Sequence, residues 1–555
     1  MNPGAAAWTR RPFARSVDAG RAATREAGIA SLITAAATIA AAGVGVRLLF
    51  APQFDGIDDA GYLDAARRVA EGLSLDNLFA LFRVRVGMAY PLGWLMQAGW
   101  LRPDQFWLLT LLAECVTMTS LVVAGALVTG RRAAGLWAAA LYAIYPLAIQ
   151  QSMMFYPTAF QVAAIAAAIA LVARSEQAPA AARLMLAAAA GVALGIGYLF
   201  KEDVAIIVIM LAMAALIARY PRLTTIIAVG GGAAAVFAAE CFAYWQTTGQ
   251  PLFRLAASSG LGAPIGDQLR IAEIWRWDAF LRSLLLVPVQ VGVIWWVAIA
   301  ATAVAVITGR RESRGLYFIA ILFVLVMAFL QFGSGSFASY SPLPKTPRYT
   351  ALATPLLMLV VGGWLARWQP ARPRLAAAVA IAIACAALPC VLYLQLSSSE
   401  RTRNTLAVLP VLKDLQVKNL YTDFYGARVL RLLERQANVR VWYHANFNTN
   451  EMMVIDAPVN GAGSFALLDH QSGKIYTSSY EMQLPASIDK PPSDWEPVWR
   501  NRAFGEDSVT RRLLEGMRQF AARLPEGNSL RGRIDRSVAD MIEGDDAVLY
   551  RLPSP

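Results

Sequence analysis

The stretch IASLITAAATIAAAGVGVRLLFA, residues 29–51, decides the fold. Crossing a hydrocarbon core of roughly 30 Å takes about 20 apolar residues, and this run is long enough to do so. It is also too long for the apolar region of a signal peptide, and no clear small-residue cleavage site follows it. We therefore expect a retained membrane anchor near the N-terminus.

The rest of the chain has the composition of a membrane protein. Of its 555 residues, 57% are apolar and only 16% are charged, which excludes an ordinary soluble domain. The sequence predicts a polytopic α-helical membrane protein with about eleven spans. The predicted spans are 29–51, 105–129, 133–149, 157–174, 184–200, 203–219, 222–243, 284–307, 315–332, 348–366 and 374–396.

Basic residues in the short connections predict the orientation, because Lys and Arg concentrate on the cytoplasmic side. The N-terminal tail and every second loop are rich in arginine, for example Arg131 and Arg132. We expect a cytoplasmic N-terminus and, with an odd number of spans, a C-terminal segment on the outer face of a bacterial inner membrane. This bias largely explains the formal net charge of +12, so the charge does not indicate nucleic-acid binding.

Three outer segments are large: 52–104, 244–283 and 397–555. Ordered loops on a rigid scaffold commonly carry the functional site, so we expect the chemistry on the outer face. Within the first segment, VGMAYPLGWLMQAGWL at 86–101 is apolar but short, and we predict an interfacial or re-entrant helix there.

Residues 397–555 have the composition of a soluble domain. The stretch beginning at Val411 predicts helix, strand, helix and strand, and GSFALLDHQ predicts a further buried strand. We expect a small α/β domain with a partly parallel sheet, and it contains no glycine-rich nucleotide fingerprint. His444 and His470 lack ligand spacing, and the four cysteines all lie in predicted spans, which favours neither zinc nor disulfides.

The segment FDGIDDAGYLDAARRVAEG, which begins at Phe54, places Asp55, Asp58 and Asp59 just after the first span. Its apolar residues recur at helical spacing, so the acids lie at the start of an amphipathic helix. Two interpretations are open. The acids are either capping residues favoured by the helix dipole or reactive groups at the mouth of the bundle.

Two further polar clusters lie at outer span ends. GYLFKEDVAIIV places Lys201, Glu202 and Asp203 at an outer turn, which is either a solvated hairpin or part of a site. KTPRYTALATP places Lys345 and Arg348, followed by Tyr349, at another span entrance. Outer cations run against the positive-inside bias, so they favour an anionic partner such as phosphate, the alternative being lipid headgroup anchoring. Arg85 and Arg270 belong to the same predicted outer positive surface.

Acids beside outer cations suit a reaction in which a phosphate leaves and a hydroxyl or amine attacks. Sugar transfer from a polyprenyl phosphate is a reaction of this kind and requires both a base and cations. Cations stabilise the departing phosphate, and an aspartate can accept the proton of the acceptor. A single displacement of this kind would invert the anomeric carbon.

Over residues 29–396 the chain resembles the GT-C superfamily of membrane glycosyltransferases, especially the bacterial branch with aminoarabinose transferases and protein O-mannosyltransferases. Five motifs carry the resemblance in the family's order. They are the acidic pair Asp58 and Asp59 with Tyr62 and Ala66, the segment from Tyr90 and Pro91 to Trp94, GYLFKEDVAIIV, YWQTTGQPLF and PRYTALATP.

The resemblance implies roles for particular residues. Asp58 would be the catalytic base with Asp59 beside it, and Lys201 and Arg348 would bind the lipid phosphate. We add Arg85, Tyr349 and Arg270 to that phosphate group. The residues assigned to acceptor binding are Asp55, Tyr62, Tyr90, Tyr156, Glu202 and Asp203. Asp55, Asp58 and Asp59 are also candidate ligands of a divalent cation, and metal dependence stays open.

Two departures from the family pattern affect these roles. Many relatives place an acid before the proline at the start of the fourth span, whereas this chain has Tyr156 before Pro157. The basic residue that often precedes the Pro-Leu helix is also missing, and Arg85 is the nearest substitute. Two other functions remain open. They are a transporter or flippase of lipid-linked sugars, which the lack of an internal repeat disfavours, and a structural subunit.

Overall fold

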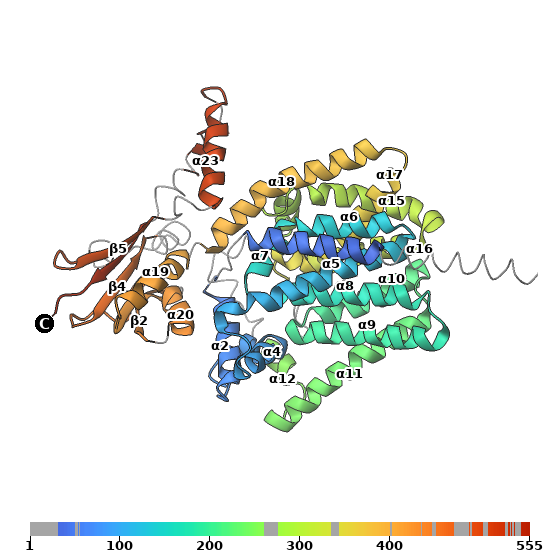
Figure 1. The fold of residues 1–555 in the computed structure, drawn as a ribbon. Helices are drawn as coiled ribbons and strands as arrows, with labels where there is room; N and C mark the ends of the chain where they lie inside the picture. Colours follow the sequence, from blue (N-terminus) through green and yellow to red (C-terminus); the bar gives the residue numbers. More distant parts are fainter. Residues whose placement is uncertain are drawn as a thin grey trace, which may run out of the picture.

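The computed structural model describes most of the bundle and part of the C-terminal domain. The described residues are 31–49, 54, 56–259, 276–334, 343–399, 402–434, 436–446, 451–470, 488, 491–502, 509–527, 531–532, 534–535, 538 and 546–554. Helices that run side by side form a bundle, and a sheet domain lies beyond one end of it (Figure 1).

The bundle is built from long apolar helices, and most of the predicted spans correspond to one helix each. The helices are Ser31–Leu48, α5 (Trp107–Thr129), α6 (Arg132–Ala143), α7 (Pro146–Met153), α8 (Pro157–Ser175), α9 (Ala180–Phe200), α10 (Val204–Ala218), α11 (Leu223–Thr248), α15 (Ile294–Glu312), α16 (Arg314–Phe332), α17 (Thr354–Trp368) and α18 (Pro373–Ser399). The predicted class, a polytopic helical membrane protein, is confirmed.

The count of spans differs in detail from the predicted eleven. Among the described residues, eight helices are long and apolar enough to cross a membrane, or nine if a bent pair is taken as one span. The pair is α6 and α7, which meet at 58°. Pro146 follows the break, and proline lacks the N–H that would continue the helix. The predicted spans 203–219 and 284–307 correspond to shorter apolar helices in α10 and α15.

Small residues let the spans approach closely. A Cβ atom added to Gly191 of α9 would lie 2.0 Å from the carbonyl oxygen of Val229 in α11. A Cβ at Gly232 of α11 would lie 2.1 Å from the carbonyl oxygen of Ala188. Without these side chains the two backbones touch, which is the usual way for membrane helices to gain packing energy.

The first large loop folds into short helices at the end of the bundle. They are α2 (Asp58–Ala70), α3 (Ala80–Val84) and α4 (Val86–Gln97). The predicted interfacial helix at 86–101 corresponds to α4, and Trp94 and Trp100 near its end are exposed, as an interfacial position requires. Gly93 of α4 packs against Val69 of α2. After α11, α12 (Phe253–Ser259), α14 (Ala279–Leu281) and η4 (Arg282–Leu286) belong to the second large loop.

The C-terminal domain contains a six-stranded sheet in the order β3-β2-β1-β4-β6-β5. β1 (Asn419–Asp423) runs parallel to β2 (Asn438–Asn446) and to β4 (Ser464–Asp469), while β3 (Glu451–Val454), β5 (Glu496–Arg502) and β6 (Asp546–Arg551) pair antiparallel. The helices α19 (Arg403–Asp414) and α20 (Phe424–Leu433) pack against the sheet, whereas α23 (Val509–Ala522) stands apart from it (Figure 1). The predicted partly parallel α/β domain is confirmed.

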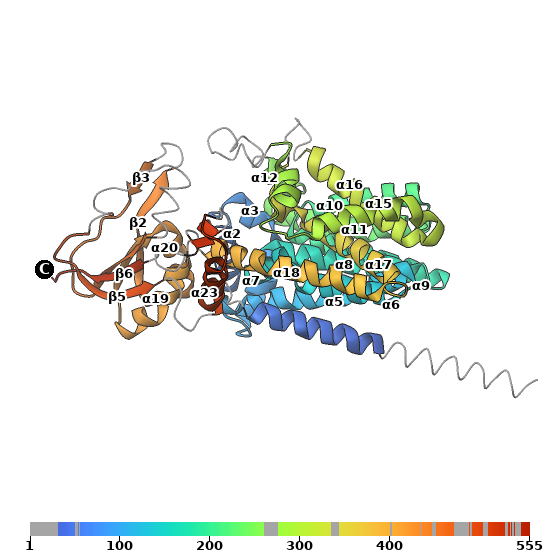
Figure 2. The ribbon, with the colours of Figure 1, turned by 90° about the horizontal axis from the view of Figure 1, so that it is seen from above.

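The two parts of the chain meet at α2 and α20. Both views place the sheet domain at the end of the bundle where the first loop lies (Figures 1 and 2). Tyr62 and Leu63 of α2 share one apolar cluster with Val429 and Leu432 of α20. The first loop is therefore enclosed between the bundle and the C-terminal domain.

Candidate active site

Asp58 and Asp59 begin α2 at the junction between the bundle and the sheet domain, but their environments differ. Asp58 is half-buried, and among the described residues it has neither a hydrogen bond nor an ion pair. Asp59 is fully buried. Its Oδ1 accepts hydrogen bonds from the backbone N–H of Gly56 at 3.0 Å and of Ala60 at 2.7 Å. Of the two predicted capping acids, only Asp59 therefore holds the local backbone.

Tyr62, one helical turn after Asp58, connects the first loop to the next cluster. Its hydroxyl is hydrogen-bonded to the Arg85 guanidinium, and the charge of Asp58 acts on it. Burial, together with Asp58, raises the pKa of Tyr62 above its usual value, although Arg85 acts in the opposite direction. The tyrosine therefore stays a neutral hydroxyl group beside Asp58.

Arg85 also forms a two-point ion pair with Glu202 of the turn between α9 and α10. Arg85 Nη2 lies 2.7 Å from Glu202 Oε1, and Nε lies 3.2 Å from Oε2. Burial alone would raise the pKa of Glu202, but the guanidinium outweighs it and lowers the pKa to about 2. A predicted phosphate ligand and a predicted acceptor ligand are thus paired with each other, and they join the first loop to the bundle.

Lys201 and Asp203 form the second pair of this turn. Lys201 Nζ lies 2.9 Å from Asp203 Oδ2, and the other carboxylate oxygen accepts a hydrogen bond of 2.6 Å from Gln161 of α8. Lys201 Nζ also lies 4.7 Å from the ring centre of Tyr349. A cation over an aromatic face is attracted by the ring, so this contact brings the turn to the start of η5 (Pro347–Ala353).

Arg348 lies beside the same ring and faces the first loop. Its guanidinium carbon is 5.4 Å from the ring centre of Tyr349, and the charges of Tyr156 and Asp58 act on it. The side chain is exposed, and in the described part of the chain no carboxylate lies at ion-pair distance from it. Arg348 is therefore a cation that a ligand can reach.

Hydrogen bonds, ion pairs and ring contacts, together with the charge of Asp58, link these side chains from remote segments into one circuit. The charge of Asp58 acts on Tyr62, and the Tyr62 hydroxyl is hydrogen-bonded to Arg85. Arg85 forms an ion pair with Glu202, which is the neighbour of Lys201 in the chain. Lys201 and Arg348 both lie against the ring of Tyr349. Arg348 in turn lies in the field of Asp58. The structure thus brings together predicted residues from α2, the α9–α10 turn and η5, with Tyr156 beside them.

The C-terminal domain contacts the loop that carries the acids. Arg428 of α20 donates a 3.1 Å hydrogen bond from Nη1 to the carbonyl of Gly56, and the Thr402 hydroxyl donates to the carbonyl of Phe54. Burial lowers the pKa of Arg428, while the charges of Asp59, Asp64 and Asp58 act in the opposite direction. Gly56 has a φ of +77°, and an added Cβ would lie 2.9 Å from Thr402, so both conformation and space favour glycine there.

Other predicted site residues lie apart from this circuit or outside the described residues. Tyr90 of α4 is 37% exposed and packs against Trp94, with ring centres 5.6 Å apart. No contact found within the described ranges joins it to Asp58 or Arg348. Asp55 and Arg270 lie outside the described residues.

The metal hypothesis stays untested. Among the described residues, no group of three His, Cys, Asp or Glu side chains is close enough to hold an ion. Asp55, which the hypothesis pairs with Asp58 and Asp59, lies outside the described residues.

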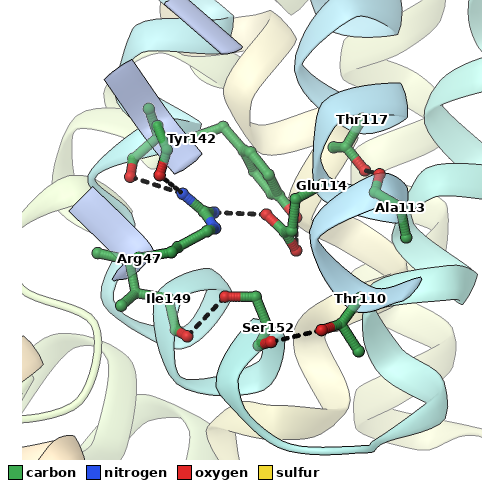
Figure 3. Close-up of polar contacts among 10 residues, drawn as sticks. Arg47, Thr110, Ala113, Glu114, Thr117, Tyr142, Ile149 and Ser152 are labelled. Atoms are coloured by element: carbon green, nitrogen blue, oxygen red, sulfur yellow. Dashed lines mark hydrogen bonds and ion pairs between the residues drawn. The ribbon is translucent and has the colours of Figure 1, made fainter. Parts of the chain in front are cut away.

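Sequence reasoning missed a buried polar cluster below the first loop. The Arg47 guanidinium pairs with Glu114 of α5 and donates from Nη1 to the carbonyl of Ala143 at 3.0 Å, and the Tyr142 hydroxyl donates to Glu114 at 3.0 Å (Figure 3). Ala143 ends α6 just before the break at Pro146, where the carbonyl lacks a helical partner. The available signal was a charge inside each of two apolar runs, which is costly unless paired.

Arg254 of α12 forms a second buried ion pair. Its Nη2 lies 2.7 Å from Glu240 of α11, and its Nη1 donates to the carbonyl of Tyr198 at 2.8 Å. Tyr198 lies in the last turn of α9, where a cation complements the helix dipole. Arg254 therefore anchors α12 beneath the turn that carries Lys201.

No protein-family model and no curated protein matches this sequence. Among solved structures, the chain is similar to ArnT from Cupriavidus metallidurans in the apo state, with a TM-score of 0.48, 13% identity, and 86% of this chain and 96% of that chain covered. The same protein bound to undecaprenyl phosphate gives a TM-score of 0.47 and 13% identity over 76% of this chain and 87% of that chain.

The chain is also similar to the archaeal oligosaccharyltransferase AglB from Archaeoglobus fulgidus, in complex with an inhibitory peptide and a dolichol-phosphate. That comparison has a TM-score of 0.42 and 12% identity, and it covers 73% of this chain. The chain spans 64% of the length of this archaeal protein.

Proposed function

We propose that this protein is a membrane glycosyltransferase of the GT-C type that its sequence resembles. The proposed reaction transfers a sugar from a polyprenyl-phosphate donor to a hydroxyl or amine acceptor, with inversion at the anomeric carbon. The proposed location is the outer face of a bacterial inner membrane, with the C-terminal domain in the periplasm.

One observation carries the proposal. Asp58, a half-buried acid without a described partner, and Arg348, an exposed cation without a described carboxylate, lie in each other's field at the end of the bundle. Neighbouring charged side chains, by contrast, are engaged: Arg85 with Glu202 and Lys201 with Asp203. An acid without a described partner, in electrostatic range of a cation that a ligand can reach, suits both proton removal and phosphate departure.

The proposed step has a simple balance of bonds and protons. The acceptor oxygen or nitrogen attacks the anomeric carbon from the face opposite the phosphate and gives its proton to Asp58. The bond between the anomeric carbon and the phosphate oxygen breaks, and the polyprenyl phosphate leaves with the electron pair. Arg348, with Lys201 beside it, stabilises the negative charge that grows on that phosphate.

The other residues of the circuit have supporting roles in this proposal. Asp59 fixes the backbone at Gly56, which sets the direction of Asp58. Arg85 and Glu202 hold the first loop against the α9–α10 turn, with Tyr62 as the link. Tyr349 keeps Lys201 and Arg348 on one side of the site, and Tyr156 and Asp203 remain candidate acceptor contacts.

The test is transfer of labelled sugar from a polyprenyl-phosphate-sugar donor by the purified protein. We expect Asp58→Asn to lower kcat by at least about a hundredfold while donor binding and melting temperature stay unchanged, because only proton transfer is lost. Arg348→Ala should weaken both donor binding and turnover, since a phosphate ligand is removed. Undiminished turnover in Asp58→Asn would refute the base role.

Asp64→Asn is the matched control. Asp64 is an acid of the same helix, but it pairs with Arg68 at 3.4 Å on the outer side of α2. This variant should keep full activity. If the wild-type protein instead exchanges intact donor between leaflets of vesicles and forms no product, the flippase function replaces the proposed one.

A further inference from the structure

The helix α23 in the C-terminal domain has a strongly basic and amphipathic sequence. Four arginines stand against one glutamate between Val509 and Arg523. The apolar side chains recur at helical spacing and so share one side: Leu513, Leu514, Met517, Phe520 and Ala521. A basic helix with one apolar side is typical of segments that lie on a membrane surface.

Among the described residues, only part of this apolar side is packed against other side chains. Leu514 and Met517 pack against Ile534 and Val538, and Ala521 is fully buried. Phe520, in contrast, is 57% exposed. The apolar side therefore has a buried part and an open part that ends in an aromatic ring.

Arginines border the open part of the helix. Arg523 lies three residues after Phe520, and Arg512 lies eight residues before it, so at 3.6 residues per turn both stand on the Phe520 half of the helix. Both arginines are exposed. Ala522 is exposed too, but it lies nearly opposite Phe520 around the helix axis.

The position of α23 matches the sequence pattern. In Figure 1, α23 stands nearly perpendicular to the membrane helices, level with the end of α18 nearest the sheet domain, and it projects sideways past the bundle. In Figure 2, after a quarter turn, it is seen almost end-on at the same level. Since the bundle helices are membrane spans, a helix perpendicular to them runs along the bilayer plane, and its far end lies beyond the side of the bundle.

We propose that α23 is a lipid-binding element that lies in the headgroup layer on the side of the C-terminal domain. Phe520 enters the boundary between headgroups and acyl chains, and Arg512 and Arg523 bind the phosphates of anionic phospholipids. Long arginine side chains reach headgroups while their stems cover apolar surface. Nearby anionic lipid also attracts the net positive charge of the helix. This surface is independent of the proposed transferase reaction.

The experiment uses the full-length protein in nanodiscs of phosphatidylglycerol and, separately, of phosphatidylcholine. Spin labels are placed by Phe520→Cys and by the control Ala522→Cys, in a background without the four native cysteines. For each spin label we compare how often it collides with oxygen, which partitions into lipid, and with a nickel chelate, which stays in water. In phosphatidylglycerol we expect the ratio of oxygen to nickel accessibility to be at least about threefold higher at 520 than at 522.

Further measurements test whether the difference between the two lipids depends on the arginine charges. Charge reversal by Arg512→Glu and Arg523→Glu, or 1 M salt, should abolish the difference between the two lipids, because salt screens exposed charges. Equal, water-like accessibility at 520 and 522 in phosphatidylglycerol would overturn the proposal. If the label at position 520 is shielded from the nickel chelate in a way that depends on protein concentration rather than on lipid, the open part of α23 binds a second copy of this chain. That result would also overturn the proposal.

A second measurement needs no cysteine-free background. Hydrogen exchange of the wild-type peptide 509–523 should be about tenfold slower in phosphatidylglycerol than in phosphatidylcholine nanodiscs. Equal exchange rates in the two lipids would count against the proposal even if the labelled variants fail to fold.

Discussion

At the scale of single residues, Asp58 and Asp59 are chemically identical neighbours in different environments. Successive residues of a helix point about 100° apart, so Asp59 turns into the protein while Asp58 stays half-buried. The sequence left capping and chemistry as equal alternatives for both acids. It could not separate them, because the direction of α2 depends on packing against α4 and α20 rather than on local pattern.

A first prediction concerns Asp59. Asp59→Asn weakens the bonds that Oδ1 accepts from Gly56 and Ala60, and charge-assisted bonds of a buried carboxylate contribute about 2 kcal/mol. We expect a lower melting temperature and lower activity together. Asp58→Asn should lower activity alone. Thermal unfolding of both variants beside the transfer assay checks this, and equal stability of the two variants would contradict it.

A second prediction concerns the ion pair of Arg85 and Glu202. The folded-state pKa of Glu202 is lowered from 4.5 to about 2, so the pair contributes stability above about pH 4.5 that is lost as the pH falls toward 2. Since about a third of the Glu202 side chain is exposed, we discount the contribution to about 2 kcal/mol. Melting temperatures measured from pH 5 to 2.5 should fall more for the wild type than for Glu202→Gln.

The control for that experiment is Glu71→Gln. Glu71 lies 3.8 Å from Arg67 in a pair on the exposed end of α2. Its substitution should leave the pH dependence of the wild type unchanged. A wild-type curve that matches that of Glu202→Gln would show that the pair contributes nothing.

At the scale of elements, the helices were predictable and their breaks less so. The spans follow from apolar runs of sufficient length, and the position of α4 follows from a run too short to cross. The 58° bend between α6 and α7 depends on Pro146, which the sequence displays, and on Arg47, whose partner lies in another span. Pairing between remote charges is invisible to any local pattern.

The N-terminus of α20 gives the third prediction. Asp423 caps this helix by accepting from the N–H groups of Tyr425 and Gly426, and burial nonetheless raises its pKa to about 6. The raised value means that its stabilising contribution is complete below about pH 3.8 and is lost as the pH rises through 6, a change of about 3 kcal/mol. Asparagine caps helices equally well but does not titrate.

We therefore expect Asp423→Asn to remove this pH dependence while keeping α20 folded. The measurement is hydrogen exchange of the peptide 419–433 in the full-length protein between pH 4 and 7, corrected for the intrinsic exchange rate. Asp456→Asn, which changes a more exposed acid paired with Arg440, serves as the control. An unchanged profile in Asp423→Asn would contradict the assignment.

At the scale of the whole molecule, the sequence separated membrane and soluble parts but did not predict how they join. Composition changes near residue 397, and the partly parallel sheet follows from its strand pattern. The contact of α20 with α2 is specified by surfaces that only the folded domain presents. The circuit of Asp58, Arg85, Lys201 and Arg348 was anticipated as a set of motifs, whereas its pairings were not.

A fourth prediction follows from that contact. Removal of residues 400–555 exposes the apolar side of α2 that packs on Val429 and Leu432 and breaks the bonds to Phe54 and Gly56. We expect loss of donor hydrolysis as well as of transfer to the acceptor, with the span bundle still inserted. Retained donor hydrolysis in the truncated protein would mean that the domain serves the acceptor alone.

The bond between Arg428 and Gly56 joins residues that are 372 positions apart in the chain. A ribosome that adds roughly 5–20 residues per second needs on the order of 20 to 75 seconds to travel that distance. During this interval the nascent protein already contains Asp58 and Asp59 and, near the end, all of its spans. The loop at Gly56 still lacks its hydrogen bond from Arg428. If the proposed transferase activity needs this bond, we expect it to begin only once the C-terminal domain has been made, and a chain that stops before Arg428 to remain an inactive bundle.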